Sequence, residues 1–301
     1  MKKFIIWFIA FVVVIVAVDF GFGAACRYLI AHAKAGFTQS HEYVANHCED
    51  EVLIFGSSRA LHHYVPEVIT DSLGMSCYNC GMDGNGILYL YSRFLMVTNR
   101  YAPKVVIYDV SSSFDLASDD YSKYLGWQKR YADIPGVMDV IADINPTEKW
   151  KLKSNLYKYN GSFLQMLTDN VHPAHTLDKT GYEPSFKVMD YEPEVKQHTR
   201  ANWDAKKKSY FEKLVSDCHE KGILLIFAYS PMYGMQSSVV YDEFTAFCKE
   251  HNVPLLDYYA SADFVHKKKY FSDSNHLNDT GAREYTMAVA REVKEIIVED
   301  N

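Results

Sequence analysis

The sequence has no excess of basic residues and no basic stripe. It contains 31 lysines and arginines against 38 aspartates and glutamates, so its net charge is −7. The lysines are scattered along the chain. Proteins that bind nucleic acid need concentrated positive charge, because neutralising phosphates supplies much of the affinity. We therefore expect no nucleic-acid partner.

A complete metal-binding motif is also missing. His172 and His175 have a short spacing, but no acidic residue or cysteine stands nearby at a helical interval to complete a site. We interpret this stretch as a solvated loop and expect neither a metal nor another cofactor.

Cysteines are few, six in all. Cys77 and Cys80 have the spacing of a redox motif, but such a motif must open a helix to lower a thiol pKa, and this one runs through a predicted strand. We interpret the pair as structural. For an oxidising compartment two disulfides stay open, Cys48 with Cys77 and Cys218 with Cys248.

What the chain does have is a long apolar run near its start. Phe4 to Val18 is uninterrupted, two lysines precede it, and Asp19 is the only charge before Arg27. The apolar segment thus counts about 20 residues, enough to span a bilayer. We interpret residues 1–26 as a transmembrane signal anchor in the cell membrane, with the N-terminus cytoplasmic and the remainder extracytoplasmic.

Two other interpretations of this segment stay open. The small residues 23–25 suit cleavage by a signal peptidase. Cys26 could be the lipidated residue of a lipoprotein, although Gly23 stands where an aliphatic residue is expected and Asp19 interrupts the apolar region. All three interpretations export the rest of the chain.

The exported part has the length of one sizeable α/β domain. Residues 27–50 are polar and partly helical, which predicts a stalk, and residues 51–301 form the domain. Within it, residues 116–200 have no convincing core strand, but helix-like pieces occur at 148–156 and 162–170. We interpret about 116–200 as an insertion of helix and loop that shapes substrate access.

Short apolar runs alternate with helical patterns along the domain. The predicted strands are 51–55, 75–79, 105–110, 223–229 and 253–258. The predicted helices are 66–73, 88–100, 205–221 and 241–251. This alternation predicts a three-layer α/β/α sandwich around a parallel, flavodoxin-like sheet of five strands.

Two serines follow the first predicted strand. Gly56 lets the backbone turn sharply, so Ser57 and Ser58 both lie near the crevice at the carboxyl edge of the sheet. Asp273 and His276 stand three residues apart in a loop before the last helix, where they can supply a base and an orienting carboxylate. These residues indicate a hydrolase or acyltransferase site. A glycine-rich turn at 79–86 offers N–H groups for an oxyanion.

The order of these elements resembles the SGNH (GDSL-type) hydrolase superfamily, over roughly residues 51–295. The anchor, the insertion and the Gly-Ser-Ser turn are most similar to exported proteins that act on cell-envelope polymers, such as the D-alanyl transfer protein of teichoic acid and the alginate O-acetylation proteins. The resemblance implies that Ser58 is the nucleophile and that Asp273 and His276 complete a triad. It also implies that the N–H groups of Ser58 and Gly84 form the oxyanion hole.

The chain departs from the family pattern at two positions. Ser57 replaces the Asp of Gly-Asp-Ser. The third block, normally Gly-x-Asn-Asp, here reads Ser-Ser-Ser-Phe at 111–114, which places Ser113 where the amide of Asn would donate to the oxyanion. A hydroxyl is a weaker donor, and losing one oxyanion donor can cost roughly 100- to 1,000-fold in rate.

Three further residues are candidates for binding substrate. Arg59 could meet an anionic substrate or form a structural salt bridge. His62 could line the crevice or pack in the protein, as could His63, and Asn85 follows the predicted oxyanion glycine.

Taken together, these features predict a membrane-anchored, extracytoplasmic serine esterase or O-acyltransferase. Its substrate would be acyl esters of a cell-envelope or surface polysaccharide, and a membrane acyltransferase is a candidate partner. The alternative is a non-catalytic scaffold of an envelope acylation system. A flavodoxin-like binding domain without covalent chemistry is a third interpretation.

Overall fold

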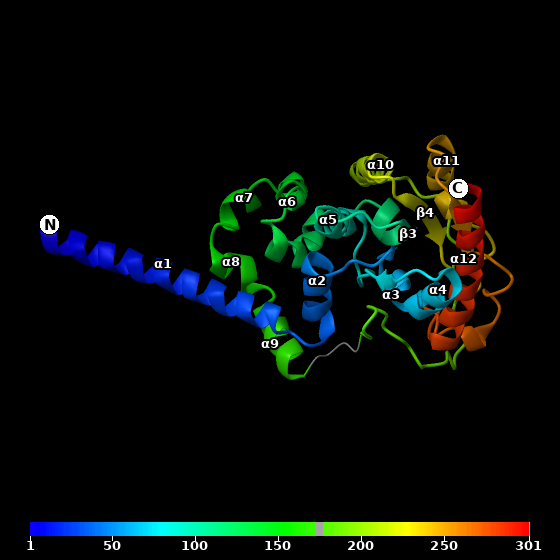
Figure 1. Ribbon diagram of the computed structural model, residues 1–301, viewed down its shortest axis with the longest axis horizontal. Helices are drawn as coiled ribbons and strands as arrows, with labels where there is room; N and C mark the ends of the chain where they lie inside the picture. The colour runs from blue at the N-terminus through cyan, green and yellow to red at the C-terminus, as the bar shows by residue number, and fades with distance from the viewer. Residues whose placement is uncertain (173–176, 301) are drawn as a thin grey trace. The chain divides into compact units, whose positions relative to one another are not determined.

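The computed structural model describes residues 1–172 and 177–300, which fall into two compact units (Figure 1). The first unit comprises Met1–His47 and Tyr121–Thr176, and the second comprises Cys48–Asp120 and Leu177–Asn301. Much of the predicted insertion and the segment predicted as a stalk therefore belong to the same unit as the N-terminal helix.

The second unit is built on one sheet of five parallel strands. The strands are β1 (Val52–Gly56), β2 (Cys77–Asn79), β3 (Val105–Asp109), β4 (Leu224–Tyr229) and β5 (Leu255–Asp257). Their order in the sheet is β2-β1-β3-β4-β5, and every neighbouring pair is parallel. This order is flavodoxin-like, which confirms the predicted fold class.

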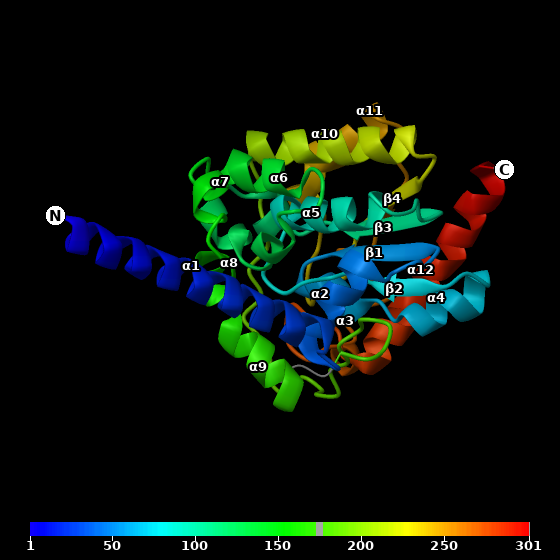
Figure 2. The ribbon, with the colours of Figure 1, turned by 60° about the vertical axis from the view of Figure 1, so that its left-hand side comes forward.

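Helices cover both faces of this sheet (Figure 2). On one side lie α3 (Ser58–His63), α4 (Pro66–Leu73) and α12 (Asp279–Asp300). On the other lie α5 (Ile87–Thr98), α10 (Ala205–Glu220) and α11 (Asp242–Glu250). Short helical turns occur at Ser112–Leu116, Val239–Tyr241 and Lys268–Tyr270.

Most residues of the strands are apolar because both faces of the sheet are largely buried. Successive side chains point to opposite faces. Ile54 and Ile107 join the cluster that includes Tyr285 of α12, whereas Phe55 meets Phe94 of α5. The two-sided burial explains why the strands could be recognised from the sequence as short apolar runs.

Local signals also set the helix boundaries. Helix α4 has Pro66 in its first turn and ends at Gly74, whose φ of 70° is the left-handed conformation that favours glycine. Helix α10 begins after Asp204, whose carboxylate accepts the N–H of Lys207. The predicted bounds of α4 are confirmed, and those of α10 differ by one residue.

The first unit is helical throughout its described residues. It contains α1 (Lys2–Ala31), α2 (Gly36–Asn46), α6 (Val137–Ile144), α7 (Glu148–Lys151), α8 (Asn155–Asn160) and α9 (Phe163–Val171), with short helical turns at Tyr121–Leu125 and Trp127–Tyr131. Helix α1 packs against α2, α8 and α9. Of the predicted helical pieces, 162–170 corresponds to α9, and 148–156 is divided between α7 and α8.

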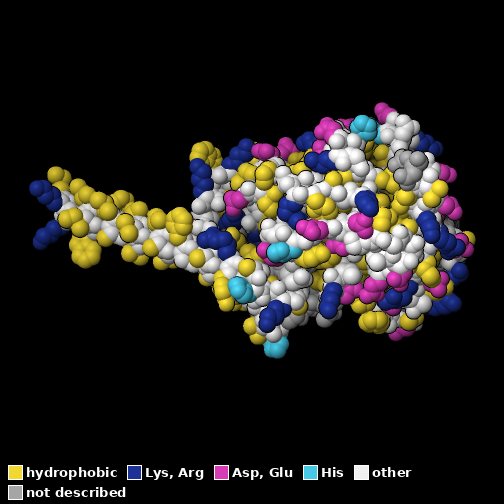
Figure 3. Space-filling model, viewed as in Figure 1, with side chains coloured by type: hydrophobic (Ala, Val, Ile, Leu, Met, Phe, Trp, Pro, Cys, Tyr) yellow, Lys and Arg dark blue, Asp and Glu magenta, His cyan; other side chains and the backbone are white. Residues whose placement is uncertain are grey.

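In the described part of the chain, α1 is the one helix long and apolar enough to cross a membrane. Its most apolar 18-residue window has a mean hydropathy of 2.7 and buries none of its surface within the protein. Figure 3 shows hydrophobic side chains along this helix and basic side chains at its tip.

Candidate active site

Ser58 stands at the sharp turn from β1 into α3. The turn requires Gly56, because its φ is 148° and a Cβ there would come within 2.7 Å of the Asp109 carbonyl oxygen. Helix α3 starts at Ser58 itself. The serine therefore sits at the carboxyl edge of the sheet and at a helix N-terminus, where backbone N–H groups lack intrahelical partners.

The three residues predicted as a triad form a continuous chain of hydrogen-bonding groups. The Oγ of Ser58 lies 2.9 Å from Nε2 of His276. The Nδ1 of His276 lies 3.0 Å from both carboxylate oxygens of Asp273. This geometry distinguishes Ser58 from its neighbour Ser57, which the sequence could not do by position alone.

Backbone hydrogen bonds fix the carboxylate of Asp273 in a position to orient the imidazole of His276. It also accepts the backbone N–H groups of Asn275 and His276, at 2.8 and 3.0 Å. Partial burial raises the pKa of Asp273, but the hydrogen bonds and the His276 ring outweigh burial and bring that pKa below its usual value. An ionised Asp273 favours the tautomer with the proton on Nδ1, which leaves Nε2 to accept the serine proton.

His63 fixes the loop that carries the base. Its Nε2 accepts the backbone N–H of Leu277, at 3.0 Å, next to His276. Complete burial, with His276 and Arg59 nearby, lowers the pKa of His63 well below its usual value. A neutral His63 can keep this acceptor role. From the sequence, only the position of His63 shortly after Ser58 was known, and its contact with Leu277 was not.

Ser58 opens onto a cavity of about 400 Å³. Its lining includes Ser58, His276, Ser113, His198 and Met232. Ser113 is exposed and faces this cavity, as an oxyanion donor must. The sequence analysis missed His198, whose Nδ1 lies 2.6 Å from the hydroxyl of Tyr259 and whose pKa is lowered by burial and by Arg59.

The glycine-rich turn after β2 contributes less directly to the site than the residues that line the cavity. Gly84 has a φ of 66°, so it occupies a left-handed turn. Neither Gly84 nor Asn85 is among the residues that line the cavity. The Nδ2 of Asn85 donates to the carbonyl oxygen of Asp83, at 2.7 Å, within the same turn. The oxyanion role of Gly84 and the binding role of Asn85 stay predictions.

Asp115 holds the serine-rich block in place. Its carboxylate accepts the N–H groups of Ser111 and Ile87, each at 2.7 Å, and the hydroxyl of Tyr108 at 2.8 Å. Burial raises the pKa of Asp115 to about 6, against the opposing effect of these donors. Residues Ser112–Leu116 form a short π-helical turn, a geometry often found at functional sites.

Arg59 borders the cavity beside Ser58. Its guanidinium donates to the carbonyl oxygen of Val110 at 2.7 Å and to the hydroxyl of Tyr241 at 2.9 Å. It also lies 3.6 Å from the buried carboxylate of Asp109. Of the two interpretations of Arg59, the geometry favours the salt bridge, because the guanidinium is committed to groups of the protein.

His62 lies beside the triad without joining it. Its ring centre is 5.6 Å from that of His276, and its Nδ1 lies 2.7 Å from the carbonyl oxygen of Glu183. Side-chain atoms of His62, Asp83 and Glu183 fall within 4.8 Å of one another and could hold a metal ion. The expectation of no metal stays a prediction, and residues 173–176, with His175, lie outside the described part of the chain.

All six cysteines are free and buried, so neither proposed disulfide is present. Cys77 begins β2 and Cys80 directly follows it, so the pair does not open a helix. Burial raises the pKa of the Cys77 thiol well above its usual value. Such a thiol is a poor nucleophile, which agrees with a structural role.

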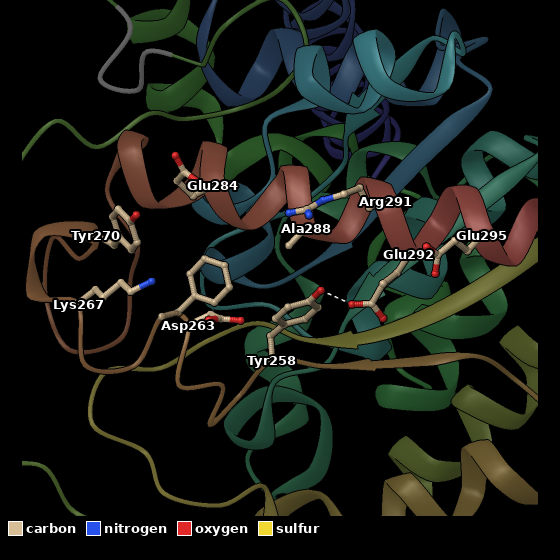
Figure 4. Close-up of a pocket in the computed structure, with 10 residues that line it drawn as sticks. Tyr258, Asp263, Lys267, Tyr270, Glu284, Ala288, Arg291, Glu292 and Glu295 are labelled. Carbon is tan, nitrogen blue, oxygen red and sulfur yellow. Dashed lines mark hydrogen bonds between the residues drawn. The ribbon is translucent and has the colours of Figure 1, made fainter.

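A second hollow lies along α12, away from the triad residues. It has a volume of about 510 Å³. Its lining includes Tyr258, Lys267, Glu284, Arg291 and Glu292 (Figure 4). The hydroxyl of Tyr258 donates to Glu292. None of the predicted catalytic residues lines this hollow, which is mainly polar.

No family model matches this chain, and neither does any curated protein. Solved structures do resemble it. One, assigned to a lipolytic protein of the G-D-S-L family from Desulfitobacterium hafniense, is 14% identical with a TM-score of 0.43, and the match covers 80% of this chain and 97% of that one. An acylhydrolase from Bacteroides fragilis is 11% identical with a TM-score of 0.40, covering 85% and 96%.

A GDSL-like lipase from Bacteroides thetaiotaomicron is 10% identical with a TM-score of 0.38, and the match covers 92% of this chain and 99% of that one. At these identities and scores the functional argument rests on the geometry of the site.

Proposed function

We propose that this protein is an SGNH-like serine esterase or O-acyltransferase. The observation that carries the proposal is the chain from Ser58 Oγ through His276 to Asp273, with separations of 2.9 and 3.0 Å. A serine, a base and an orienting carboxylate in this order are the requirements for acyl transfer through a covalent intermediate. The cavity beside Ser58 gives an acyl ester room to approach.

The proposed reaction has two steps. In the first, Ser58 Oγ attacks the acyl carbonyl while Nε2 of His276 takes the serine proton; the ester C–O bond then breaks and His276 protonates the leaving alcohol. The N–H of Ser58, the side chain of Ser113 and the N–H of Gly84 are the proposed oxyanion donors. In the second step, water or a sugar hydroxyl attacks the acyl-serine while His276 takes its proton; the bond from the acyl carbon to Ser58 Oγ then breaks, and His276 returns the proton to Oγ. Water gives hydrolysis, and a sugar hydroxyl gives transfer.

The proposal places the enzyme at the cell membrane, with α1 as a retained single-pass anchor and the remainder extracytoplasmic. Helix α1 continues without a break through the small residues where a signal peptidase would cut. Cys26 is completely buried in a cluster with Tyr159 and Met166. Cleavage or lipidation at this point would remove or disrupt that packing, which supports the anchor over the two alternatives.

We further propose that the substrate is an acylated polysaccharide or similar polymer of the cell envelope, with a membrane acyltransferase as a partner that supplies the acyl group. The support is the resemblance of the anchored chain and its Gly-Ser-Ser turn to envelope acylation proteins. The competing function is a non-catalytic scaffold, and the feature that favours it is Ser113 at the position of the usual Asn.

Labelling with a fluorophosphonate tests the proposal. The full chain in detergent is treated beside Ser58→Ala, His276→Ala and Ser57→Ala, and the adduct is located by peptide mass. We expect an adduct on Ser58 that requires His276 and persists in Ser57→Ala. A folded wild-type protein that acquires no adduct would overturn the enzymatic proposal and support the scaffold.

A further inference from the structure

Helix α1 carries a carboxylate that its neighbours satisfy completely. One oxygen of Asp19 accepts the hydroxyl of Ser154 at 2.7 Å and the N–H of Leu156 at 2.9 Å. The other accepts the N–H and the side-chain amide of Asn155, at 3.0 and 2.9 Å. An ionised group in an apolar helix is costly without such partners. Asp19 therefore ties the start of α8 to α1.

Helix α9 lies along the next turns of the same helix. The ring of Phe163 meets that of Phe22, with centroids 5.2 Å apart. Further along, the amide of Asn170 donates to the carbonyl oxygen of Leu29, at 3.0 Å. Gly23 allows the close approach of α8, because a Cβ there would lie 2.5 Å from Asn155. Both helices are thus fixed against α1.

The contacts fall at the level where α1 would leave a bilayer. At about 1.5 Å per residue, Asp19 lies about 22 Å and Phe22 about 27 Å along the helix from Phe4. The hydrocarbon core of a bilayer is about 30 Å thick. If the core begins near Phe4, the start of α9 lies within about 3 Å of the depth where acyl chains meet headgroups, and the start of α8 lies about 8 Å inside that boundary.

The outer face of α9 is apolar, and none of the residues that the structure describes covers it. Leu164, Leu167 and Val171 are spaced so that they share one helix face, and their exposed fractions are 75%, 37% and 70%. An adjoining face, with Phe163 and Met166, packs in the cluster around α1. Because α9 exposes a second apolar stripe beside the one that it buries, water is a poor surrounding for this stripe.

Residues typical of a membrane interface also occur in and beside α7 of the same unit. Trp150 is 72% exposed, and the ammonium of Lys153 lies 4.1 Å from the centre of its ring. Lys149 and Lys151 flank the tryptophan in sequence. Tryptophan and lysine are enriched where hydrocarbon meets water, because each combines an apolar body with a polar end.

From these observations we infer that the outer face of α9, together with α7 and α8, docks on the lipid leaflet beside α1. The occupant is the bilayer itself, since the face is continuous with the helix that enters it and carries the pairing of apolar and basic side chains that suits an anionic leaflet. The first unit would then contact the membrane through this surface as well as through α1. This inference rests on the anchoring part of the proposed function and is independent of its chemistry.

Site-directed spin labelling tests the inference. All six native cysteines are buried, so a thiol-specific spin label should react preferentially with a newly introduced cysteine. The full chain is reconstituted in vesicles of phosphatidylcholine and phosphatidylglycerol with a label at Leu164→Cys or Val171→Cys. Collision with oxygen, which prefers lipid, is compared with collision with a water-soluble nickel chelate. Labels at Val12→Cys and at the exposed position Glu212→Cys are the controls for lipid and water.

We expect the label at 164 to collide more often with oxygen than with the nickel chelate, as at position 12, and the label at 171 to lie at a shallower depth. If the labels at 164 and 171 behave like the one at 212 while 12 is in lipid, docking is wrong and anchoring stands. If 164 is shielded from both reagents, a protein covers the face and the inference is also wrong. A water-exposed label at 12 would overturn the anchoring on which it rests.

Discussion

The strands of the second unit and helix α9 of the first unit place their apolar side chains differently. In the second unit Val52 and Ile54 are fully buried between the sheet and its helices. In the first unit Leu164 and Val171 are exposed, while the carboxylate of Asp169, itself 2% exposed, accepts the N–H of Thr38 inside the unit. The contrast teaches that the strands of the second unit suit a core shielded from water, whereas the exposed face of α9 in the first unit suits lipid.

The largest effect is expected from a substitution at the candidate active site of the second unit. Ser58→Ala should lower esterase activity on an activated ester by about 10⁴-fold or more, because the nucleophile is lost and only binding and oxyanion contacts remain. Ser57→Ala should keep most of the activity. Initial rates of p-nitrophenyl acetate hydrolysis, with circular dichroism to verify folding, measure both. Activity of folded Ser58→Ala within tenfold of wild type would contradict the assignment.

The interior of the second unit should be intolerant of an unpaired charge. Arg59→Met leaves the buried carboxylate of Asp109 without its cation, and breaking a buried ion pair costs about 3–5 kcal/mol. We expect a correspondingly lower free energy of unfolding from denaturant titration. The double variant Arg59→Met/Asp109→Leu should recover part of the loss. Equal stability of the wild type and Arg59→Met would show that the pair does not support the site.

The pH dependence of stability should report on Asp115. Its pKa of about 6 in the folded protein exceeds the usual value of about 3.9, so the folded state binds this proton more tightly than the unfolded state. Stability from this group should therefore fall as pH rises from about 4 to about 6, by about 3 kcal/mol. Asp115→Asn cannot titrate and should lack this slope. Parallel unfolding profiles of the two proteins at pH 4, 5, 6 and 7 would contradict the prediction.

Removing the carboxylate of Asp19 should destabilise the first unit less than removing Arg59 destabilises the second. Asp19→Ala removes the acceptor of the partly exposed donors at the start of α8, and each hydrogen bond lost costs about 0.5–1.5 kcal/mol. We expect faster limited proteolysis within residues 148–171 and unchanged labelling of Ser58 by a fluorophosphonate. Asp19→Asn, which keeps one acceptor oxygen, should lie between the variant and the wild type. Unchanged proteolysis of Asp19→Ala would show that α8 is held by packing alone.

The sequence predicted the second unit better than the first for physical reasons. Five strands were recognisable because parallel strands buried on both faces are continuous apolar runs. Asp273, His276 and the pair Ser57 and Ser58 were recognisable as candidates because turns at the carboxyl edge of such a sheet gather side chains at one place, and the family resemblance then selected Ser58. The spacing of Asp273 and His276 also allows the carboxylate of Asp273 to accept backbone N–H groups of its own loop.

Other features of the site depend on contacts between distant residues. Nothing near Leu277 in the sequence indicates that its N–H meets His63, and the partners of Arg59 lie on β3, β4 and α11 or next to them. The same holds for the first unit, where Asp19 meets residues 154–156 only after the chain folds back on α1. Charge and spacing alone left the role of Arg59 open, and the disulfides that spacing allowed did not form.

The central claim is that Ser58 receives the acyl group. Rapid acid quench of the full chain mixed with p-nitrophenyl acetate, followed by peptide mass analysis, measures this directly. The account predicts one acetyl group on Ser58, formed in the wild type and absent from His276→Ala. An acetyl group on another residue, or turnover of the ester with Ser58 unmodified and dispensable, would contradict it.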